Sequence, residues 1–127
     1  MTKRGMKFER DLIHMFWDKG YAALRSAGSG AARHPTPDVV AGNGRKFIAL
    51  EVKKRNNLPV YLTENEVKEL VMFSNLFGAS AYIAVKIPRK EWKFIDIDHL
   101  KKGKSYRVDE EVYSAGMDFE RVTGVEE

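Results

Sequence analysis

Two acids and a lysine, which could do chemistry together, occur within residues 38–53. The sequence predicts that this stretch is one β-hairpin. Asp38 opens a short apolar run, Asn43-Gly44 is a strong signal for a two-residue hairpin turn, and residues 46–53 form the returning strand. Because the turn folds the strands back on each other, we expect the acid at the start of the first strand to lie near the end of the second.

The returning strand carries Glu51 and Lys53 on one face. Side chains two positions apart in a strand project to the same side, whereas Val52 between them points into the core. The carboxylates of Asp38 and Glu51 beside an ammonium group are costly to assemble without a ligand. Because hard cations prefer oxygen ligands, the pattern indicates a site for magnesium (Mg²⁺), with manganese (Mn²⁺) as a substitute.

Other catalytic chemistries find little support in the sequence. The chain contains no cysteine, which excludes a disulfide framework, a thiolate zinc site and a cysteine nucleophile. Its three histidines are scattered, so neither a histidine metal cluster nor a serine-histidine-aspartate triad is indicated. The glycines at residues 28–30 match no phosphate-binding loop, and residues 42–44 are a turn rather than a dinucleotide fingerprint. A metal would therefore be bound by oxygen atoms.

Length and composition predict one globular unit. The 127 residues are enough for a hydrophobic core but too few for two domains, so we expect a single domain over residues 1–127. No apolar run approaches the roughly 18 residues of a membrane span, and no signal-peptide pattern opens the chain. We therefore expect an intracellular, cytoplasmic protein without a membrane partner.

Positive charge is concentrated in the N-terminal part of the chain. Residues 1–55 hold 12 Lys or Arg against 5 Asp or Glu, whereas residues 56–127 hold 10 against 13. The first part therefore carries +7 and the second −3, which sum to the net charge of +4. Basic residues around the acidic hairpin suit a polyanion brought to a metal site, although a solvated basic surface is the simpler alternative.

Residues 3–19 are predicted to form an amphipathic helix, and residues 21–25 a short strand. Apolar residues recur at helical spacing from Phe8 onward, and Gly20 is a stop signal. Glu9 lies beside the apolar stripe. Considered alone, it could simply form a surface ion pair with a basic residue of the same helix.

A turn-rich loop over residues 26–37 directly precedes Asp38. It is rich in small residues and carries Ser29, Arg33 and His34. A long loop in this place suits a mobile segment that binds substrate, and a flexible linker is the alternative.

A second helix is predicted to begin after Thr63 and to end at Gly78. Thr63 and Glu66 match a capping box. In the second half of the helix, apolar side chains wrap almost all round, whereas a surface helix needs only one apolar stripe. The surplus face, which includes Phe73 and Phe77, is either buried deep within the chain or forms a dimer interface.

The rest of the chain predicts simpler elements. In chain order, they are a buried strand over residues 80–86, a strand over residues 91–97 that pairs with it as a hairpin, a solvated loop with Lys101, Lys102 and Lys104, a strand over residues 106–108 and a short helix over residues 117–122.

The order of these features resembles that of the archaeal Holliday-junction resolvases, members of the restriction-endonuclease-like nuclease superfamily. The resemblance covers nearly the whole chain. It rests on the helix with Glu9, the segment over residues 25–29, the turn over residues 40–44, the run Glu51-Val52-Lys53 and the later segment over residues 84–86.

The resemblance implies an α/β fold with a central mixed β-sheet flanked by helices, as in a restriction-endonuclease-like nuclease core. It also implies a symmetric homodimer and magnesium-dependent hydrolysis of DNA at four-way junctions, in homologous recombination and repair. Replication or recombination proteins are possible further partners.

Roles of individual residues also follow from the resemblance. Asp38 and Glu51 match the metal-binding carboxylates, Glu9 a helix-borne acid, Lys53 the catalytic lysine and Ser29 a loop serine that closes over the phosphate. Phe73 and Phe77 match aromatic residues of the dimer-forming helix. We expect DNA to be contacted by the basic residues near the hairpin and the first helix, namely Arg4, Lys7, Arg10, Arg25, Arg33, Lys54 and Arg55.

Phosphodiester hydrolysis needs an attacking water and neutralised phosphoryl oxygens, which a hard cation can supply. We expect Asp38, Glu51 and the Val52 carbonyl to bind magnesium, Lys53 to orient the water, and Glu9 to bind a second ion or its water. A nuclease of this fold that acts on flaps, ends or duplex DNA is one alternative. A non-catalytic module that binds DNA structures is another, although binding alone needs no carboxylate cluster.

Overall fold

The computed structural model describes the backbone of residues 3–26 and 34–124, and the side chains of residues 7–26 and 34–124. A five-stranded sheet forms its centre. The strands, in spatial order, are β1 (Ala22–Arg25), β2 (Val39–Gly42), β3 (Phe47–Lys54), β5 (Ser80–Lys86) and β6 (Lys93–Asp96). The central β3–β5 pair is parallel and the other pairs are antiparallel. The predicted mixed sheet is therefore confirmed.

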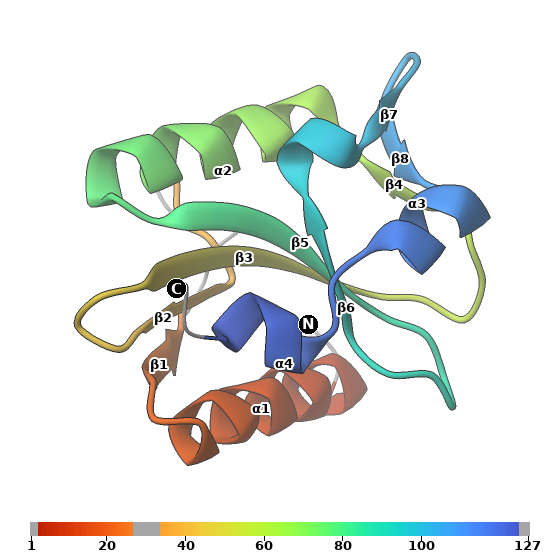
Figure 1. Cartoon of the computed structure of the whole chain (residues 1–127). Helices are drawn as coiled ribbons and strands as arrows, with labels where there is room; N and C mark the ends of the chain where they lie inside the picture. The colour runs from red at the N-terminus through yellow and green to blue at the C-terminus, as the bar shows by residue number, and fades with distance from the viewer. Residues whose placement is uncertain (1–2, 27–33, 125–127) are drawn as a thin grey trace.

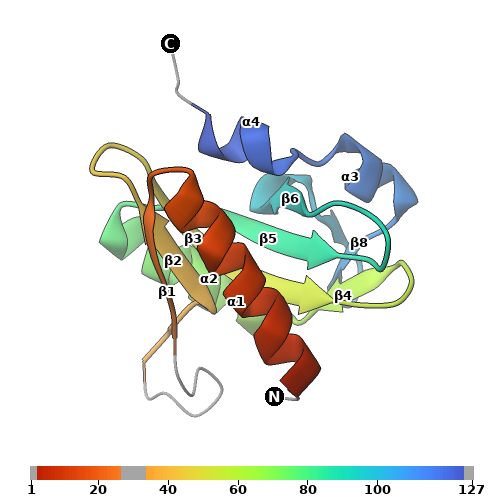
Figure 2. The same ribbon diagram turned by 90° about the horizontal axis from the view of Figure 1, so that it is seen from below.

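Helices cover both faces of this sheet (Figure 1). The N-terminal helix α1 (Lys3–Asp18) and the short helix α4 (Phe119–Thr123) lie on one face, and α2 (Glu64–Phe77) lies on the other. Seen from below, α1 crosses the strands obliquely (Figure 2). Each face has its own hydrophobic core, one centred on Phe16 and Phe94 and the other on Ile83 and Leu70.

The β2–β3 hairpin forms as its turn residues predict. Gly44 takes a positive φ of 91°, which the left-handed region allows a glycine at little cost. The Asn43 side-chain oxygen accepts hydrogen bonds from the backbone N–H groups of Arg45 and Lys46, at 2.8 and 2.6 Å. The register pairs Val39 with Leu50, so the end of β3 extends beyond the start of β2.

The crossover from β3 to β5 runs through α2, whose predicted ends are confirmed. Thr63 and Glu66 form the capping box, and Gly78 ends the helix in the left-handed conformation. The side of α2 that faces the sheet buries Val67, Leu70 and Ser74.

Among the residues that the structure describes, the outer side of α2 is largely exposed. Met72, Leu76 and Phe77 are 47, 86 and 53% exposed. Deep burial of this face within one chain was one of the two interpretations of its pattern, and for these side chains it is wrong.

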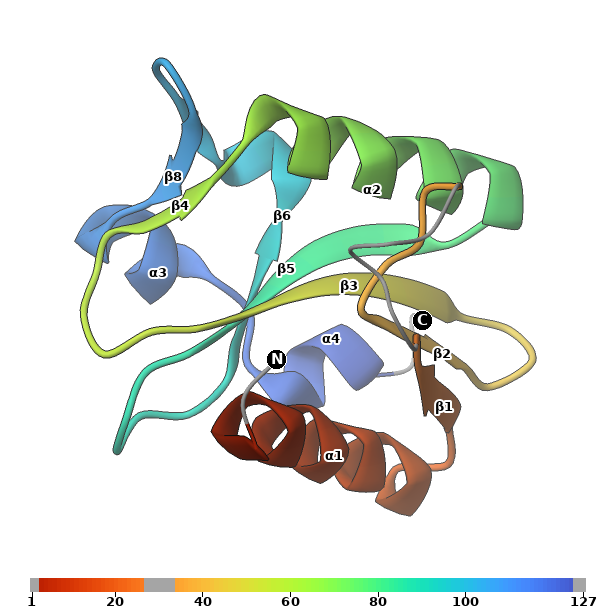
Figure 3. The same ribbon diagram turned by 180° about the vertical axis from the view of Figure 1, so that it is seen from behind.

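A second, smaller sheet lies at one end of the molecule (Figure 3). Its strands, in spatial order, are β4 (Val60–Leu62), β8 (Tyr106–Val108) and β7 (Lys101–Lys102). A 3₁₀ turn, η2 (Ile97–His99), leads into it, and helix α3 (Glu110–Ala115) packs beside it.

Part of this region was not predicted from the sequence. The pattern indicated the strand at β8 but not β4, β7 or α3. The expected solvated loop is wrong for Lys101, which pairs in β7 and makes ion pairs with Asp109 and Glu111, at 2.7 and 3.0 Å. The short terminal helix is confirmed as α4. In the described part of the chain, no helix is long and apolar enough to cross a membrane.

Candidate active site

Asp38 is held against the neighbouring strand by its backbone and its side chain. It directly precedes β2, and its N–H donates to the carbonyl of Leu50 at 2.9 Å. Its carboxylate Oδ2 accepts a hydrogen bond from the backbone N–H of Val52 at 2.8 Å. This bond fixes the Asp38 carboxylate beside Glu51, the residue before Val52.

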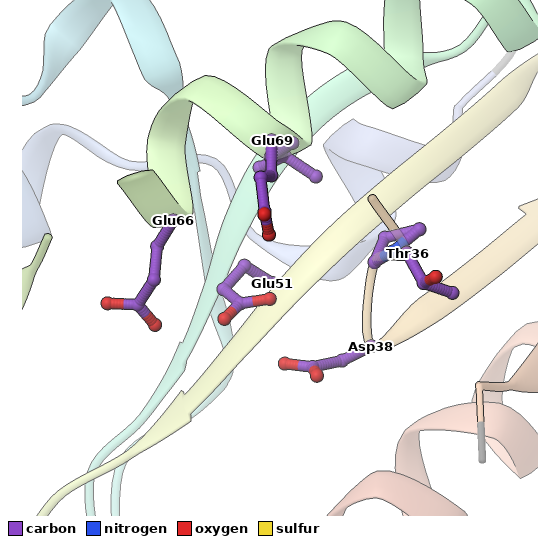
Figure 4. Close-up of a pocket in the computed structure, with 7 residues that line it drawn as sticks. Thr36, Asp38, Glu51, Glu66 and Glu69 are labelled. Carbon is purple, nitrogen blue, oxygen red and sulfur yellow. The ribbon is translucent and has the colours of Figure 1, made fainter. Parts of the chain in front are cut away.

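Glu51 lies between Asp38 and the first turn of α2 in a small acidic pocket (Figure 4). The pocket has a volume of ≈ 160 Å³. It is lined by Thr36, Pro37, Asp38, Glu51, Glu66, Glu69 and Leu70. Strand β3, the segment before β2 and the inner side of α2 thus bring four carboxylates together.

This environment favours the protonated form of Glu51. Burial raises the pKa of Glu51 to about 9, and the negative charge of Asp38 and hydrogen bonds shared with Asp38 and Glu66 act in the same direction. The ammonium group of Lys53 opposes this shift. The raised pKa of Glu51 reflects how unfavourable its negative charge is in this cluster when no cation is bound there.

Lys53 projects to the same side of β3 as Glu51, as predicted, and forms an ion pair with Glu66. Its Nζ lies 2.6 Å from Glu66 Oε2, and the two side chains are 13 and 29% exposed. Although burial by itself raises the pKa of Glu66, hydrogen bonds from Lys53 and from the Thr63 N–H lower it.

Glu9 is buried, with 4% of its surface exposed. Its Oε1 has no hydrogen-bond partner, although an Arg25 guanidinium nitrogen lies 3.8 Å away. Burial and, next, the charge of Asp38 raise the pKa of Glu9, whereas Arg25 lowers it. The alternative of a surface ion pair within its own helix is therefore wrong, because the side chain points inward and its cation comes from β1.

The donor set fits a hard divalent cation. Asp38 and Glu51 present adjacent oxygen ligands, and a cation between them would offset both the burial and the neighbouring negative charge that raise the pKa of Glu51. Within residues 3–26 and 34–124, no three acidic or histidine side chains converge closely enough to hold one ion by themselves. Backbone carbonyl groups and water would have to complete the coordination.

Several predicted DNA-binding residues lie around one end of β3. Lys7 and Arg10 are exposed on α1, and Arg55 is exposed just after β3. The Lys54 ammonium lies 5.3 Å from the ring centre of Phe8, which places the end of β3 beside α1. Arg25 contacts Glu9 as described above.

Three predicted site residues cannot be placed in the same way. Ser29 and Arg33 lie outside the described residues, and for Arg4 only the backbone is described.

Sequence reasoning missed Glu66 and Glu69 as members of the site. Glu66 had been given a role as the capping residue of the helix, and no further role was considered for it. The spacing of Glu66 and Glu69 was the available signal, since residues three apart share one side of a helix. That this side covers Glu51 and Lys53 depends on how α2 packs over β3.

The fold and the site together define a class of protein. A mixed sheet between helices, with Asp38 before one strand and Glu51-Val52-Lys53 on the next, is the core of a restriction-endonuclease-like nuclease, as the sequence resemblance predicted.

Comparisons with known proteins identify the family. The family model for archaeal Holliday junction resolvase (Hjc) matches residues 1–127. A crossover junction endodeoxyribonuclease Hjc from Archaeoglobus fulgidus is 48% identical over 125 residues, which are 98% of this chain and 92% of the relative. Its namesake from Methanocaldococcus jannaschii is 32% identical over 123 residues, 96% of this chain and 88% of the relative.

A solved structure agrees with this result. The structure of Archaeoglobus fulgidus Hjc, a Holliday junction resolvase, superimposes with a TM-score of 0.90 at 49% identity, over 93% of this chain and 97% of that chain. The present chain belongs to the archaeal Holliday junction resolvase family.

The raised pKa of Glu51 predicts how stability depends on pH. The folded protein holds this proton up to about 9, whereas the unfolded chain releases it near 4.5. The resulting stabilisation is complete below the unfolded value and is lost as the pH rises through the folded one. In EDTA, the Tm of the wild type should therefore fall relative to that of Glu51→Gln between about pH 5 and about pH 9.

Exposed Asp98→Asn is the control, and its Tm should follow that of the wild type across the range. Parallel Tm profiles for the wild type and Glu51→Gln would contradict the assignment of the shift to Glu51.

Proposed function

We propose that this protein is a structure-selective endonuclease that resolves four-way DNA junctions by paired nicking, in homologous recombination and repair. The observation that carries the proposal is the Asp38–Glu51 pair. A hydrogen bond from the Val52 N–H holds the Asp38 carboxylate beside Glu51, and Lys53 lies next to this pair. The family gives the substrate class, because its named relatives are crossover junction endodeoxyribonucleases. A protein with this role would work in the cytoplasm, with the chromosome.

The proposed cofactor is Mg²⁺, with Mn²⁺ as a substitute. Asp38, Glu51 and the Val52 carbonyl would hold it, and Glu9 would hold a second ion or order a water molecule. When bound, the cation neutralises charge on the scissile phosphate and makes water a stronger nucleophile.

The residues of the chain supply the remaining functions. The Lys53 ammonium group contacts Glu66, which lines the acidic pocket, and from there it can donate to the attacking water and balance negative charge that develops on the phosphate. The bond from the Val52 N–H holds the Asp38 carboxylate in one orientation beside Glu51. The neighbouring Arg25 balances the buried charge of Glu9. The product would carry a 5′-phosphate and leave a 3′-hydroxyl.

We also propose that two copies of the chain act as a symmetric homodimer through the outer side of α2. Phe73 and Phe77 stack with ring centres 5.1 Å apart. With Met72, Leu76, His34 and Pro35 they line one apolar groove. A two-fold interface would present two active sites to a junction that has its own approximate two-fold symmetry, and each site would nick one strand.

The first experiment on the proposal removes one metal-binding carboxylate. Asp38→Asn or Glu51→Gln should lower cleavage of a labelled four-way junction by about 100-fold or more in Mg²⁺, because each loses a ligand. Junction binding should stay equal or become tighter, since each variant also loses a negative charge. Mn²⁺ should replace Mg²⁺, whereas Ca²⁺ should support binding without efficient cleavage.

The same assay with flap, duplex and single-stranded DNA separates the alternatives. Faster cleavage of flaps or duplex would indicate another nuclease of this fold, and tight binding without cleavage in any metal would indicate a non-catalytic module. Near-wild-type turnover by either variant in Mg²⁺ would overturn the metal assignment.

The second experiment concerns the basic residues around the site. If Arg10 binds a phosphate, Arg10→Ala should weaken junction binding and reduce the slope of log K against log salt by about 0.9 for each phosphate that the variant no longer neutralises. Lys104→Ala, in the distant turn between β7 and β8, is the matched control and should leave the slope unchanged. Equal slopes for the wild type and Arg10→Ala would place the DNA elsewhere.

The third experiment tests the dimer. Replacing both Phe73 and Phe77 by Asp would place four like charges in a two-fold interface, so sedimentation should show a monomer. The monomer should stay folded, because Phe77 is 53% exposed and Phe73 is only partly buried against the core, but it should lose tight junction binding and paired nicking.

The control carries the same charges elsewhere. Leu24→Asp with Tyr61→Asp changes two side chains that are 62 and 57% exposed, and should remain a dimer. A folded, fully active monomer of the Phe73 and Phe77 variant would refute the need for a dimer, and global unfolding would show that the two rings belong to the core.

A further inference from the structure

Glu66 is fixed from two directions. Its Oε1 accepts a hydrogen bond from the backbone N–H of Thr63 at 2.9 Å, and its own N–H donates to Thr63 Oγ1 at 3.0 Å. Its second oxygen, Oε2, lies 2.6 Å from Lys53 Nζ. The same carboxylate thus completes the cap of α2 and holds a side chain of β3.

The contact with Lys53 exceeds what a capping box needs. A capping glutamate satisfies a backbone donor at the helix end, and it can do so while facing solvent. Here the side chain turns towards the pocket that Asp38 and Glu51 share (Figure 4). Its partner Lys53 is only 13% exposed. A lysine side chain has several rotatable bonds, so a fixed partner decides where its ammonium group lies.

The chemistry of the site makes this anchor useful. Glu51, which shares a face of β3 with Lys53, is a proposed metal ligand. A cation bound by Glu51 would repel the Lys53 ammonium group, so Glu51 by itself could not hold that group in place. Glu66 belongs to a different element and is anchored there by the Thr63 N–H, so it can keep its contact with Lys53 when Glu51 binds a cation.

We propose that Glu66 is a positioning residue that sets the location of the Lys53 ammonium group during DNA cleavage. This inference rests on the proposed function. Glu66 need not touch DNA or metal, because it acts through Lys53. Helix α2 thereby takes part in the reaction through its first turn.

Single-turnover cleavage of a four-way junction in Mg²⁺ tests the inference. Glu66→Ala should lower the cleavage rate constant by about 10- to 100-fold, the loss typical of a misplaced catalytic group. The Kd for the junction, measured in Ca²⁺, should change by less than about threefold, because no phosphate contact is removed. Glu66→Gln should retain part of the rate, since its one amide oxygen can accept from Lys53, although its NH2 group then faces the Thr63 N–H in place of the second oxygen.

Thr63→Ala is the matched control. It removes the side-chain half of the cap but leaves the Glu66 carboxylate and its Thr63 N–H partner. It should lower the Tm by about 4 °C while keeping the wild-type cleavage rate. If Thr63→Ala lost as much rate as Glu66→Ala, helix stability and not Lys53 would explain the effect, and the inference would be overturned.

A double-mutant cycle decides whether Glu66 acts through Lys53. Adding Glu66→Ala to Lys53→Ala should lower the rate no further than Lys53→Ala alone, whereas independent effects would multiply. Multiplied effects, or a Glu66→Ala rate within about twofold of wild type, would overturn the inference. Failure of the wild type itself to cleave the junction would instead refute the proposed function.

Discussion

Repulsion between two carboxylates is the constraint around which this structure is built. Asp38 and Glu51 come from adjacent strands and enter one pocket, where burial makes two negative charges unfavourable. Folding tolerates the arrangement because the hydrogen bond from the Val52 N–H fixes Asp38, and because Glu51 can keep its proton. A site of this kind is stabilised when a cation arrives. The same pairing that costs stability therefore supplies affinity for metal.

The distribution of charge around this pocket explains how an acidic site can act on DNA. A polyanion would be repelled by a cluster of four carboxylates. The basic residues of α1 and of the end of β3 lie beside that cluster, and Arg25 balances the buried Glu9. Positive potential beside the acidic cluster can attract the phosphates of DNA. Only part of the +7 charge of residues 1–55 lies here, because Lys19 pairs with Glu120, and Arg45 and Lys46 lie in the β2–β3 turn.

Helix α2 joins three parts of the molecule. Its inner side packs Val67 and Leu70 on the sheet, its first turn brings Glu66 to Lys53, and its outer side leaves an apolar groove uncovered. Because a short capped helix moves as a rigid body, the distance between the groove and the pocket is set by helix geometry. A second copy of the chain bound at the groove would therefore hold its own acidic pocket at a defined distance from the pocket of the first copy.

The sequence by itself determined the features that depend on neighbouring residues. Asn43-Gly44 specified the hairpin, period-two alternation put Glu51 and Lys53 on one face, and Thr63 and Gly78 set the ends of α2, because turns, strand faces and caps are local. The roles proposed for the acids and the lysine rest on residue type, spacing and family resemblance, and they stay predictions.

Only the tertiary structure decided which distant residues meet. Glu66 reaches Lys53 because α2 crosses over β3 on its way to the parallel strand β5, and Glu9 is buried because α1 packs beneath β1 and β2. The strands β4 and β7 are too short to show a periodic pattern: β4 depends on pairing with β8, far away in sequence, and β7 has only two residues, which pair with β8 across a short turn. Such contacts depend on how whole elements pack, which no local pattern records.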